Sequence, residues 1–513
     1  MKTIRAFLCA AIALNSLAAL GADAKPNILY ILCDDLGYGD VKCLNPEGKI
    51  ATPAIDKLAA AGMAFTDAHS SSAVCTPTRY SILTGRYNWR SSLKSGVLFG
   101  YSQPLIEPGR LTVPALLKEN GYATACIGKW HLGMKWPLKD GGFAKADGDA
   151  HKVDYTKPIL NGPTTVGFDE YFGISASLDM PPFIFIENDH CVGDATVEKK
   201  WIRSGPAEKD FEAVNVLPTL GNKACQFLAK QQAGKPFFLY LPLTAPHTPI
   251  VPGPEWEKKS GLTPYGDFVM QVDAVVGNVL AALDKSGLAD NTLVVFTSDN
   301  GFSPYADLKG LLDKGHNPSY HFRGTKADIF DGGHRIPFIA RWTGKIKAGS
   351  TSDQLICLSD LMATCAEILG AKLPENAGED SVSILPALLG ISDKPLREAV
   401  VHHSVNGSFS IRQGNWKFEL CAGSGGWSDP KPGKKAERDL PPVQLYDLAS
   451  DIGEKINVQD RHPEIVASLT KLLEKYAADG RSTPGASQKN TGEVDIWKAG
   501  RESLKAASNA KGD

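Results

Sequence analysis

Short apolar runs recur along the chain as far as residue 342, and polar residues follow most of them. The runs are 27–33, 122–127, 236–242, 292–297 and 336–342. A strand that is buried on both faces of a parallel sheet is apolar along its whole length, whereas a half-exposed strand alternates. The pattern therefore predicts five buried strands.

Amphipathic segments between these runs predict helices. Thr52-Pro53 begins one that extends to about Ala61, because threonine is a good N-cap and proline suits the first helical position. A second helix covers 112–120, and a third covers 268–283. Alternating strands and helices indicate the α/β class, with a large mixed, mainly parallel sheet flanked by helices. Such sheets bind ligands beyond the carboxyl ends of their strands, which is where the polar residues of this chain gather.

The pattern changes after about Pro386. Short strand patterns at 399–403, 409–412, 416–420 and 444–448 are followed by one helix pattern at 463–478. Gly414-Asn415 is a turn signal between two of these strands. The sequence predicts a main domain over 25–390 and a smaller C-terminal antiparallel α+β domain over 391–485. A polar, loosely ordered tail is expected over 486–513.

The first 24 residues are typical of a secretory signal peptide. Lys2 and Arg5 precede an apolar run from Ala6 to Leu20, and Ala22-Asp23-Ala24 offers small residues for cleavage. No later stretch is judged long and apolar enough to cross a bilayer. We expect a secreted or periplasmic protein with no membrane partner after cleavage. The formal net charge is -2, so no basic surplus indicates nucleic acid as a partner.

Acidic residues stand at the ends of two of the predicted strands. Asp34-Asp35 follows the first strand, and Asp299-Asn300 follows the fourth. Side by side they would offer three carboxylates and an amide oxygen, which suits a hard cation such as Ca²⁺ better than zinc. Both sequences are also common turn formers, so either pair alone is weak support for a metal site.

Cys75 begins the segment Cys75-Thr76-Pro77-Thr78-Arg79, which is followed by Leu83-Thr84-Gly85-Arg86. Taken alone, the cysteine would be an ordinary buried thiol. The pattern C-x-P-x-R followed by L-T-G-R, however, resembles the highly specific signature of the sulfatase family, in the alkaline-phosphatase-like superfamily. In that family the cysteine is oxidised to formylglycine. One hydroxyl of the aldehyde hydrate attacks sulfur, and the other later loses its proton to expel sulfate.

The resemblance extends in order from about Pro26 to Leu389 and implies a set of site residues. The implied ligands of one Ca²⁺ ion are Asp34, Asp35, Asp299, Asn300 and the modified Cys75. Segments Gly128 to Gly133, Ala245 to Pro249 and Arg323 to Lys326 resemble further family motifs. By this resemblance Arg79 stabilises the hydrate, Lys129 and Lys326 bind sulfate, His131 takes a proton from the hydrate, and His247 protonates the leaving oxygen.

The resemblance also implies partners and a substrate class. A formylglycine-generating or an anaerobic sulfatase-maturing enzyme would modify Cys75. The chain is similar to secreted carbohydrate sulfatases of the arylsulfatase A and N-acetylgalactosamine-6-sulfatase type, which favours exo-acting 6-O-desulfation of a galactose or N-acetylhexosamine glycan. Ser177, Asn188, Asp189 and His190 are candidate substrate-binding residues, and Trp201 is a candidate for stacking on a sugar.

Two other functions stay open at this stage. A formylglycine-dependent phosphodiesterase or phosphonate monoester hydrolase would share the nucleophile. Asn300, which stands where two-zinc phosphatases of this superfamily commonly have a histidine, argues for one Ca²⁺ ion instead. An inactive glycan-binding relative would show damage at one or more of the expected positions, and the sequence shows none.

Overall fold

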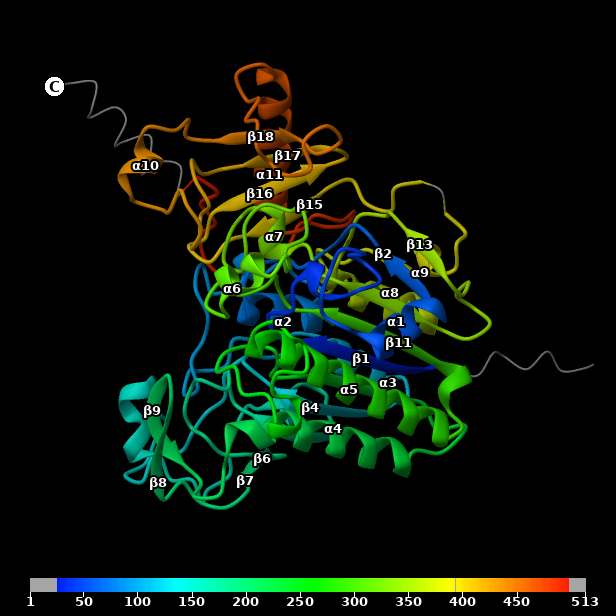
Figure 1. Ribbon diagram of the computed structural model, residues 1–513, viewed down its shortest axis with the longest axis vertical. Helices are drawn as coiled ribbons and strands as arrows, with labels where there is room; N and C mark the ends of the chain where they lie inside the picture. The colour runs from blue at the N-terminus through cyan, green and yellow to red at the C-terminus, as the bar shows by residue number, and fades with distance from the viewer. Residues whose placement is uncertain (1–24, 393, 498–513) are drawn as a thin grey trace, which may run out of the picture.

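The computed structural model describes residues 25–392 and 394–497 (Figure 1). The predicted signal peptide, residues 1–24, lies outside the described residues, as do residues 498–513 of the predicted tail. The described chain forms one large sheet flanked by helices and a smaller sheet at one end of it (Figure 1).

A ten-stranded sheet has the order β13-β2-β12-β11-β1-β10-β4-β5-β6-β7. Its parallel centre consists of β11 (Thr292–Ser298), β1 (Asn27–Cys33), β10 (Phe237–Pro242), β4 (Ala123–Lys129) and β5 (Glu170–Ile174). The outer strands are β12 (Phe338–Arg341), β2 (Met63–Phe65), β13 (Ser350–Ser352), β6 (Ile186–Glu187) and β7 (His190–Cys191). β12 is antiparallel to both β11 and β2. The predicted mixed, mainly parallel sheet is confirmed, and all five predicted strands belong to it.

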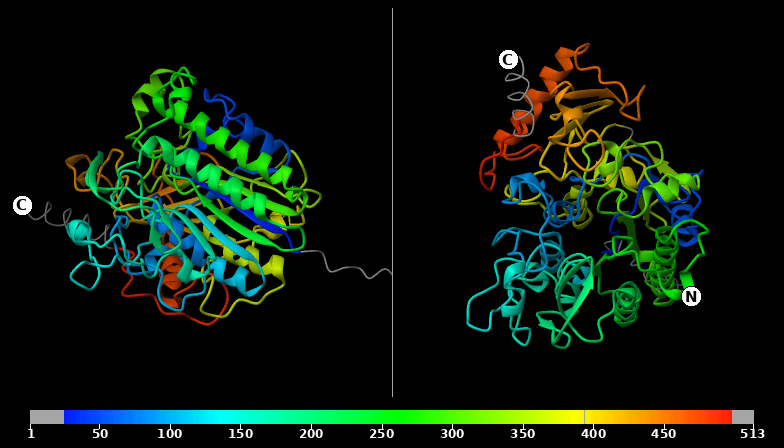
Figure 2. Two further views of the ribbon diagram at one scale, coloured as in Figure 1. Left: turned by 90° about the horizontal axis from the view of Figure 1, so that it is seen from below. Right: turned by 60° about the vertical axis from the view of Figure 1, so that its left-hand side comes forward.

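Helices cover both faces of the sheet (Figure 2). One face carries α1 (Pro53–Ala60), α4 (Ala213–Lys230) and α5 (Pro264–Lys285), and the other carries α2 (Cys75–Thr84), α3 (Val113–Glu119) and α8 (Leu361–Leu369). Leu29 and Ile31 of β1 lie in the first core, whereas Ile28 and Tyr30 lie in the second. Successive strand residues face opposite sides, so β1 is buried on both, which explains its continuous apolar sequence.

Helix α5 corrects one expectation from the sequence. By length and composition it is apolar enough to cross a membrane. However, 67% of its most apolar window is buried inside the protein. Its apolar residues pack against the sheet and α4, as those of a core helix do.

The C-terminal region forms the predicted antiparallel α+β unit. Its strands are β15 (Val400–His403), β16 (Phe409–Gln413), β17 (Trp416–Glu419) and β18 (Gln444–Asp447), paired in that order, and α11 (Pro463–Asp479) packs on them. The segment after α11 differs from the expected loose tail as far as residue 497. Ile496 is buried, and the Arg90 guanidinium donates to the Asn490 side-chain oxygen at 3.1 Å.

Shorter elements complete the described chain. They are β3 (Ala68–His69), β14 (Ile356–Cys357), α6 (Leu308–Asp313), α7 (Asp331–His334), α9 (Leu385–Leu388), α10 (Lys435–Arg438) and the hairpin β8 (Val197–Trp201) with β9 (Arg203–Ala207). The hairpin is a separate two-stranded ribbon beyond the β6–β7 edge of the large sheet (Figure 1). Trp201 anchors it, with its ring 4.8 Å from that of Phe183 and 5.8 Å from that of Phe211.

Three buried histidines lie where the main part of the chain meets the C-terminal sheet. His69 of β3 and His334 of α7 are in hydrogen-bond contact through their Nδ1 atoms at 2.9 Å, and the His402 ring of β15 stacks on His334 at 3.8 Å. Burial and the nearby Arg335 lower the pKa of His69 to about 4. Burial and neighbouring histidine and Lys417 charges hold the pKa values of His334 and His402 well below 6.5. All three imidazoles are therefore neutral at pH 7.

We expect this cluster to make the fold sensitive to mild acid. In the unfolded chain each imidazole binds a proton below its ordinary pKa of 6.5, whereas the folded protein excludes that proton. Stability is therefore complete above pH 6.5 and is lost as the pH falls toward 4, by up to about 1.4 kcal/mol per histidine per pH unit. Urea unfolding at pH 7, 6 and 5 measures the slope.

His402→Gln should reduce this pH dependence, because glutamine does not titrate. His190→Gln, at an exposed turn, serves as the matched control and should leave the slope as it is in the wild type. An unchanged slope in His402→Gln would show that the cluster does not govern acid stability.

Candidate active site

The candidate site lies at the carboxyl ends of the central parallel strands. Asp34 and Asp35 directly follow β1, Asp299 and Asn300 directly follow β11, and Lys129 is the last residue of β4. β1 pairs with both β11 and β10, and β10 pairs with β4. The topology thus brings these polar residues to one edge, where open α/β sheets bind ligands.

Cys75 reaches this edge from α2. It is the first residue of the helix and is 2% exposed. Arg79 follows one turn later, and residues four apart lie on the same helix face. The Arg79 guanidinium donates to Asp299 Oδ2 from Nη2 at 2.7 Å and from Nε at 3.0 Å. This pair fixes the start of α2 against the end of β11.

Two lysines complete a buried charge network. Lys129 Nζ lies 2.7 Å from Asp34 Oδ2. Lys326 Nζ lies 2.6 Å from Asp35 Oδ1 and 3.6 Å from Cys75 Sγ. With the Arg79–Asp299 pair, three carboxylates are balanced by three cationic side chains. Every member is at most 5% exposed at the side chain, so each charge depends on its partners rather than on water.

The same cluster has the donor atoms of a metal site. Asp34 Oδ1 and Asn300 Oδ1 are buried and have no hydrogen-bond partner. Asp34, Asp35, Cys75 and His247 each offer a ligand atom within 4.8 Å of the others. An unpartnered buried oxygen is unfavourable by about 1–3 kcal/mol, and a bound cation removes this penalty. The residues present therefore fit a metal ion.

Nearby charges and burial shift the pKa values of Asp34 and Asp299 in opposite directions. Burial alone would raise the pKa of Asp34, but Lys129 and the other nearby cationic groups hold it well below its usual range. Burial and the neighbouring Asp34 raise the pKa of Asp299, and Arg79 only partly opposes them. Burial raises the pKa of the Cys75 thiol to about 12, against Lys129 and Lys326. Cys75 is therefore a neutral thiol and a poor nucleophile in this state.

His131 is held as a neutral base. Burial and the charges of Lys129 and Arg79 keep its pKa well below 6.5. Its Nε2 lies 2.7 Å from the Leu98 carbonyl oxygen, which can only accept, so Nε2 carries the proton. Its Nδ1 then has a free lone pair, and this atom is buried without a partner. His131 is thus equipped to take up a proton inside the site.

His247 reaches the site from the loop after β10. Its Nδ1 donates to the Thr248 carbonyl oxygen at 2.5 Å, and its Nε2 lies 3.7 Å from Asp35 Oδ2. Burial and the charge of Lys326 lower its pKa.

Backbone strain occurs at this edge of the sheet. Asp35 has φ +66° and His131 has φ +59°, the left-handed region that non-glycine residues rarely adopt. Gly128, next to Lys129, has φ +142°, and a Cβ atom there would lie 1.8 Å from the Pro242 carbonyl oxygen. Such strain persists only where the surroundings enforce it, and it is typical of functional sites.

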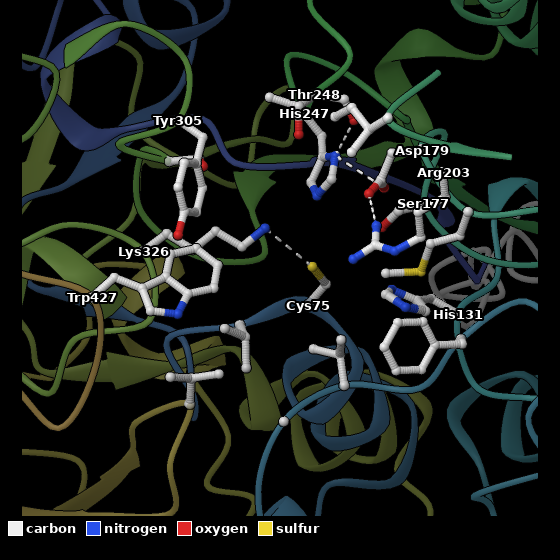
Figure 3. A pocket seen from close by; sticks show the side chains of 18 residues that line it. Cys75, His131, Ser177, Asp179, Arg203, His247, Thr248, Tyr305, Lys326 and Trp427 are labelled. Atoms are coloured by element: carbon white, nitrogen blue, oxygen red, sulfur yellow. Dashed lines mark hydrogen bonds and ion pairs between the residues drawn. The ribbon is translucent and has the colours of Figure 1, made fainter. Parts of the chain in front are cut away.

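A cavity of about 510 Å³ opens above Cys75 (Figure 3). His131, Ser177, His247 and Lys326, four of the residues singled out in the sequence, line it together with Cys75. The Ser177 hydroxyl is buried without a hydrogen-bond partner. The volume is within the range of pockets that hold small ligands.

The structure does not bring Asn188, Asp189 or His190 to this cavity. Asn188 Oδ1 accepts from the Tyr171 N–H at 3.0 Å, and Asp189 pairs with His190 at 2.7 Å on the exposed turn between β6 and β7. Their polarity reflects that turn, so the structure offers no support for them as substrate-binding residues here. Trp201, the proposed stacking residue, is instead the hydrophobic anchor of the β8–β9 hairpin.

Several other residues that the sequence did not single out also line the cavity, and four of them are charged or aromatic residues of its outer part. These four are Asp179, Arg203, Tyr305 and Trp427. They come from separate loops and from the start of β9, so no local motif joins them. The only available signal was that Tyr305 and Trp427 are aromatic residues in segments rich in polar and small residues.

Comparisons with known proteins identify the family of the chain. The sequence model of the sulfatase family matches residues 26–371. An N-acetylgalactosamine-6-O-sulfatase of Bacteroides thetaiotaomicron is 36% identical over 88% of this chain and 93% of its own length. Human arylsulfatase A is 33% identical over 93% of this chain and 92% of its own length.

Solved structures show the same relationship. One solved structure is of a Bacteroides thetaiotaomicron protein labelled 6S-sulf, from work on the metabolism of multiple glycosaminoglycans. It is 33% identical to this chain and has a TM-score of 0.77, and the match covers 88% of this chain and 99% of that protein. The PsFucS1 sulfatase of a Pseudoalteromonas species has 25% identity and a TM-score of 0.67, covering 90% and 92%. The chain therefore belongs to the sulfatase family and is a sulfuric ester hydrolase.

Proposed function

We propose that this sulfatase removes a 6-O-sulfate from a terminal N-acetylgalactosamine or galactose unit of a sulfated glycan. The observation that carries the proposal is the 36% identity, over 88% of the chain, to a protein named N-acetylgalactosamine-6-O-sulfatase. The cavity above Cys75, of about 510 Å³, is within the size range of pockets that enclose a small ligand, which supports a terminal sugar as the bound unit. The enzyme would thus be exo-acting.

One Ca²⁺ ion is the proposed metal. Asp34, Asp35, Asp299 and Asn300 would hold it together with the modified Cys75, and the unpartnered oxygens of Asp34 and Asn300 support this assignment. An oxygen-rich set is what calcium prefers. When bound, the ion would supply positive charge for a sulfate oxygen and for the attacking hydroxyl. It would also neutralise carboxylate charge, so Lys129 and Lys326 would no longer be needed as carboxylate partners and would be available to sulfate.

Formylglycine made from Cys75 is the proposed nucleophile. The buried thiol, with its raised pKa, is unsuited to attack, which favours a role that depends on modification. The aldehyde supplies a hydrate whose second hydroxyl allows sulfate to leave by elimination. The maturation partner is a formylglycine-generating or an anaerobic sulfatase-maturing enzyme.

The surrounding residues would orient the sulfate ester and move protons. Lys129 and Lys326 would bind sulfate oxygens, and Arg79 would hold the hydrate beside Asp299. The free Nδ1 lone pair of His131 would take the proton when sulfate is expelled. Preorganised positive charge is effective here, because the site is buried and charge shifts onto sulfate oxygens and the leaving oxygen during transfer.

His247 is the proposed acid for the leaving oxygen. With Nδ1 donating to Thr248, Nε2 is the atom that would carry the transferred proton. Its lowered pKa works against this role when no anion lies beside it. An arriving sulfate ester brings negative charge next to Lys326, however, and so would raise the pKa of His247 toward the value an acid needs.

We further propose that the protein is exported to the periplasm or secreted, on the strength of the N-terminal sequence. A sulfated carbohydrate would be its substrate there, and neither nucleic acid nor a membrane is a proposed partner.

Substrate preference tests the proposal against the phosphate-ester alternative. We expect sulfate release from 6-sulfated N-acetylgalactosamine and from 4-nitrophenyl sulfate, with 4-nitrophenyl phosphate at least about 10²-fold slower, because the proposed site would hold one Ca²⁺ ion rather than two zinc ions. Ion chromatography of released sulfate and phosphate measures this. A preference for the phosphate ester would overturn the sulfatase chemistry. Release from 4-sulfated but not 6-sulfated sugar would overturn the proposed position.

A further inference from the structure

The outer part of the cavity has two different walls. Figure 3 shows Tyr305 and Trp427 on one side of Cys75, and Asp179 and Arg203 on the other. The nucleophile position lies between them. A substrate whose sulfate reaches Cys75 must therefore pass between an aromatic wall and a charged wall.

The aromatic wall joins the two domains. The rings of Tyr305 and Trp427 lie 5.1 Å apart at 58°, and Tyr305 is 71% exposed. Trp427 comes from the C-terminal unit, and its backbone N–H donates to Asp328 Oδ1 at 2.8 Å. Asp328 Oδ2 also accepts from the Thr325 N–H at 2.8 Å, so one carboxylate fixes both Trp427 and the segment that carries Lys326. The C-terminal unit thus completes the cavity.

The charged wall is held by the β8–β9 hairpin. Arg203 pairs with Asp179 Oδ2, and it is presented by the tight turn at Ile202. Ile202 has φ +86° and is 58% exposed in the cavity lining, an arrangement that a β-branched residue adopts only under constraint. Trp201 anchors that turn against Phe183. The strain is located where the hairpin contacts the cavity.

Asp179 has one oxygen left for a ligand. Its residue is 5% exposed, and Oδ1 is buried without a hydrogen-bond partner. His247 Nδ1 lies 4.0 Å from Oδ1, but it is already donating to Thr248. A carboxylate oxygen can only accept, so Oδ1 requires a donor from a ligand, such as a sugar hydroxyl.

The cavity has no spare positive charge among the described residues that line it. In the proposed mechanism Lys326 would be occupied by the first sulfate, and Arg203 is paired with Asp179. A second sulfate on the same sugar ring would meet the unpartnered Asp179 oxygen without a free cation to offset it. Like charges at short range are strongly unfavourable in a buried site.

We propose that Asp179 is a specificity-determining residue that binds a free hydroxyl beside the sulfated arm of the sugar, while Tyr305 and Trp427 pack on the sugar face. The substrate class is then a singly sulfated ring, and a ring with a second sulfate beside the first is rejected. This inference rests on the proposed function. In a hexosamine the hydroxyl nearest the C6 arm is at C4, so the 4,6-disulfated ring is the informative competitor.

The test compares kcat/KM for 6-sulfated and for 4,6-disulfated N-acetylgalactosamine in the holoenzyme, by released sulfate. The wild type should prefer the singly sulfated sugar by about 10²-fold, because that sugar donates a hydrogen bond to a charged oxygen and avoids one charge repulsion. Asp179→Asn should lower kcat/KM for the singly sulfated sugar about tenfold or more and narrow the preference to within about tenfold. Glu212→Gln is the control, because it removes the ion-pair partner of Lys199 in the β8–β9 hairpin, and both residues lie outside the cavity. It should change neither kcat/KM for the singly sulfated sugar nor the preference between the two sugars.

The ratio of the two kcat/KM values distinguishes hydroxyl recognition by Asp179 from an indirect effect of Asp179 on His247. The two sugars share one leaving group, so a disturbed His247 would slow both equally and leave the preference intact. An unchanged preference in Asp179→Asn, or equal rates in the wild type, would overturn the inference. If the wild type hydrolyses 4-nitrophenyl sulfate but neither sugar, the proposed 6-O-desulfation fails instead.

Discussion

Replacing Cys75 by alanine should abolish sulfate ester hydrolysis, with kcat falling at least about 10³-fold. Alanine has no atom that a maturation enzyme can oxidise to the proposed aldehyde. Cys75 is buried at the first turn of α2, and alanine retains the helix there, so the fold should persist. The assay is sulfate release from 4-nitrophenyl sulfate, with circular dichroism to verify folding.

Cys43→Ala is the matched control, because Cys43 is exposed and lies outside the cavity. It should retain wild-type activity. Mass spectrometry of the peptide around Cys75, in protein from a host with the maturation enzyme, should show the aldehyde. A Cys75→Ala enzyme with more than a tenth of the wild-type kcat would contradict the proposed nucleophile.

The central strands were predictable because one physical feature determines them. β1 and β11 are buried on both faces, so their apolar runs are unbroken, and their boundaries match the structure closely. The direction of β12 was not predictable, because an apolar run of that length fits a parallel or an antiparallel neighbour equally well. Helix α4 was missed because Pro218 lies inside it. Packing against α5 and the sheet overrides that local penalty.

Helix α2 shows a subtler limit. Its C-x-P-x-R motif was recognised, but the helix was not predicted. Pro77 is the third helical residue, where the backbone N–H has no partner within the helix, so proline is tolerated. The segment is thus both the family signature and the start of a helix. That explains how Cys75 and Arg79 face the same carboxylates.

The inner site was predictable and the outer site was not, for a topological reason. Asp34 and Asp299 follow parallel strands directly, and carboxyl ends of such strands meet at one edge. Trp427 and Arg203 depend instead on how a distant loop and a hairpin dock, through Asp328 and Trp201. Family resemblance of the segment and its polarity led to Asn188 and His190, but polarity indicates exposure and not direction. Long-range contacts of this kind leave no local sequence pattern.

Asp35→Asn should also disable the site, through a different cause from that of Cys75→Ala. The change removes one of three buried carboxylates and leaves Lys326 without its ionic partner. We expect weaker Ca²⁺ binding and a fall in kcat of about 10²-fold or more, since the metal contributes several kcal/mol of charge stabilisation. A second measurement does not depend on activity. Millimolar Ca²⁺ should raise the Tm of the chelator-treated wild type by several degrees and should hardly shift the variant.

Asp273→Asn supplies the control for this experiment. Asp273 is also a buried carboxylate, but it accepts from the backbone N–H groups of Ala54 and Ile55 at the start of α1 rather than lining the site. Its loss should lower Tm at every Ca²⁺ concentration while preserving the Ca²⁺-induced rise. The comparison therefore depends on how much Ca²⁺ raises the Tm of each variant, and not on its Tm without Ca²⁺. A full rise in Asp35→Asn would mean that the ion binds elsewhere and that the strand-end carboxylates serve only to hold the lysines.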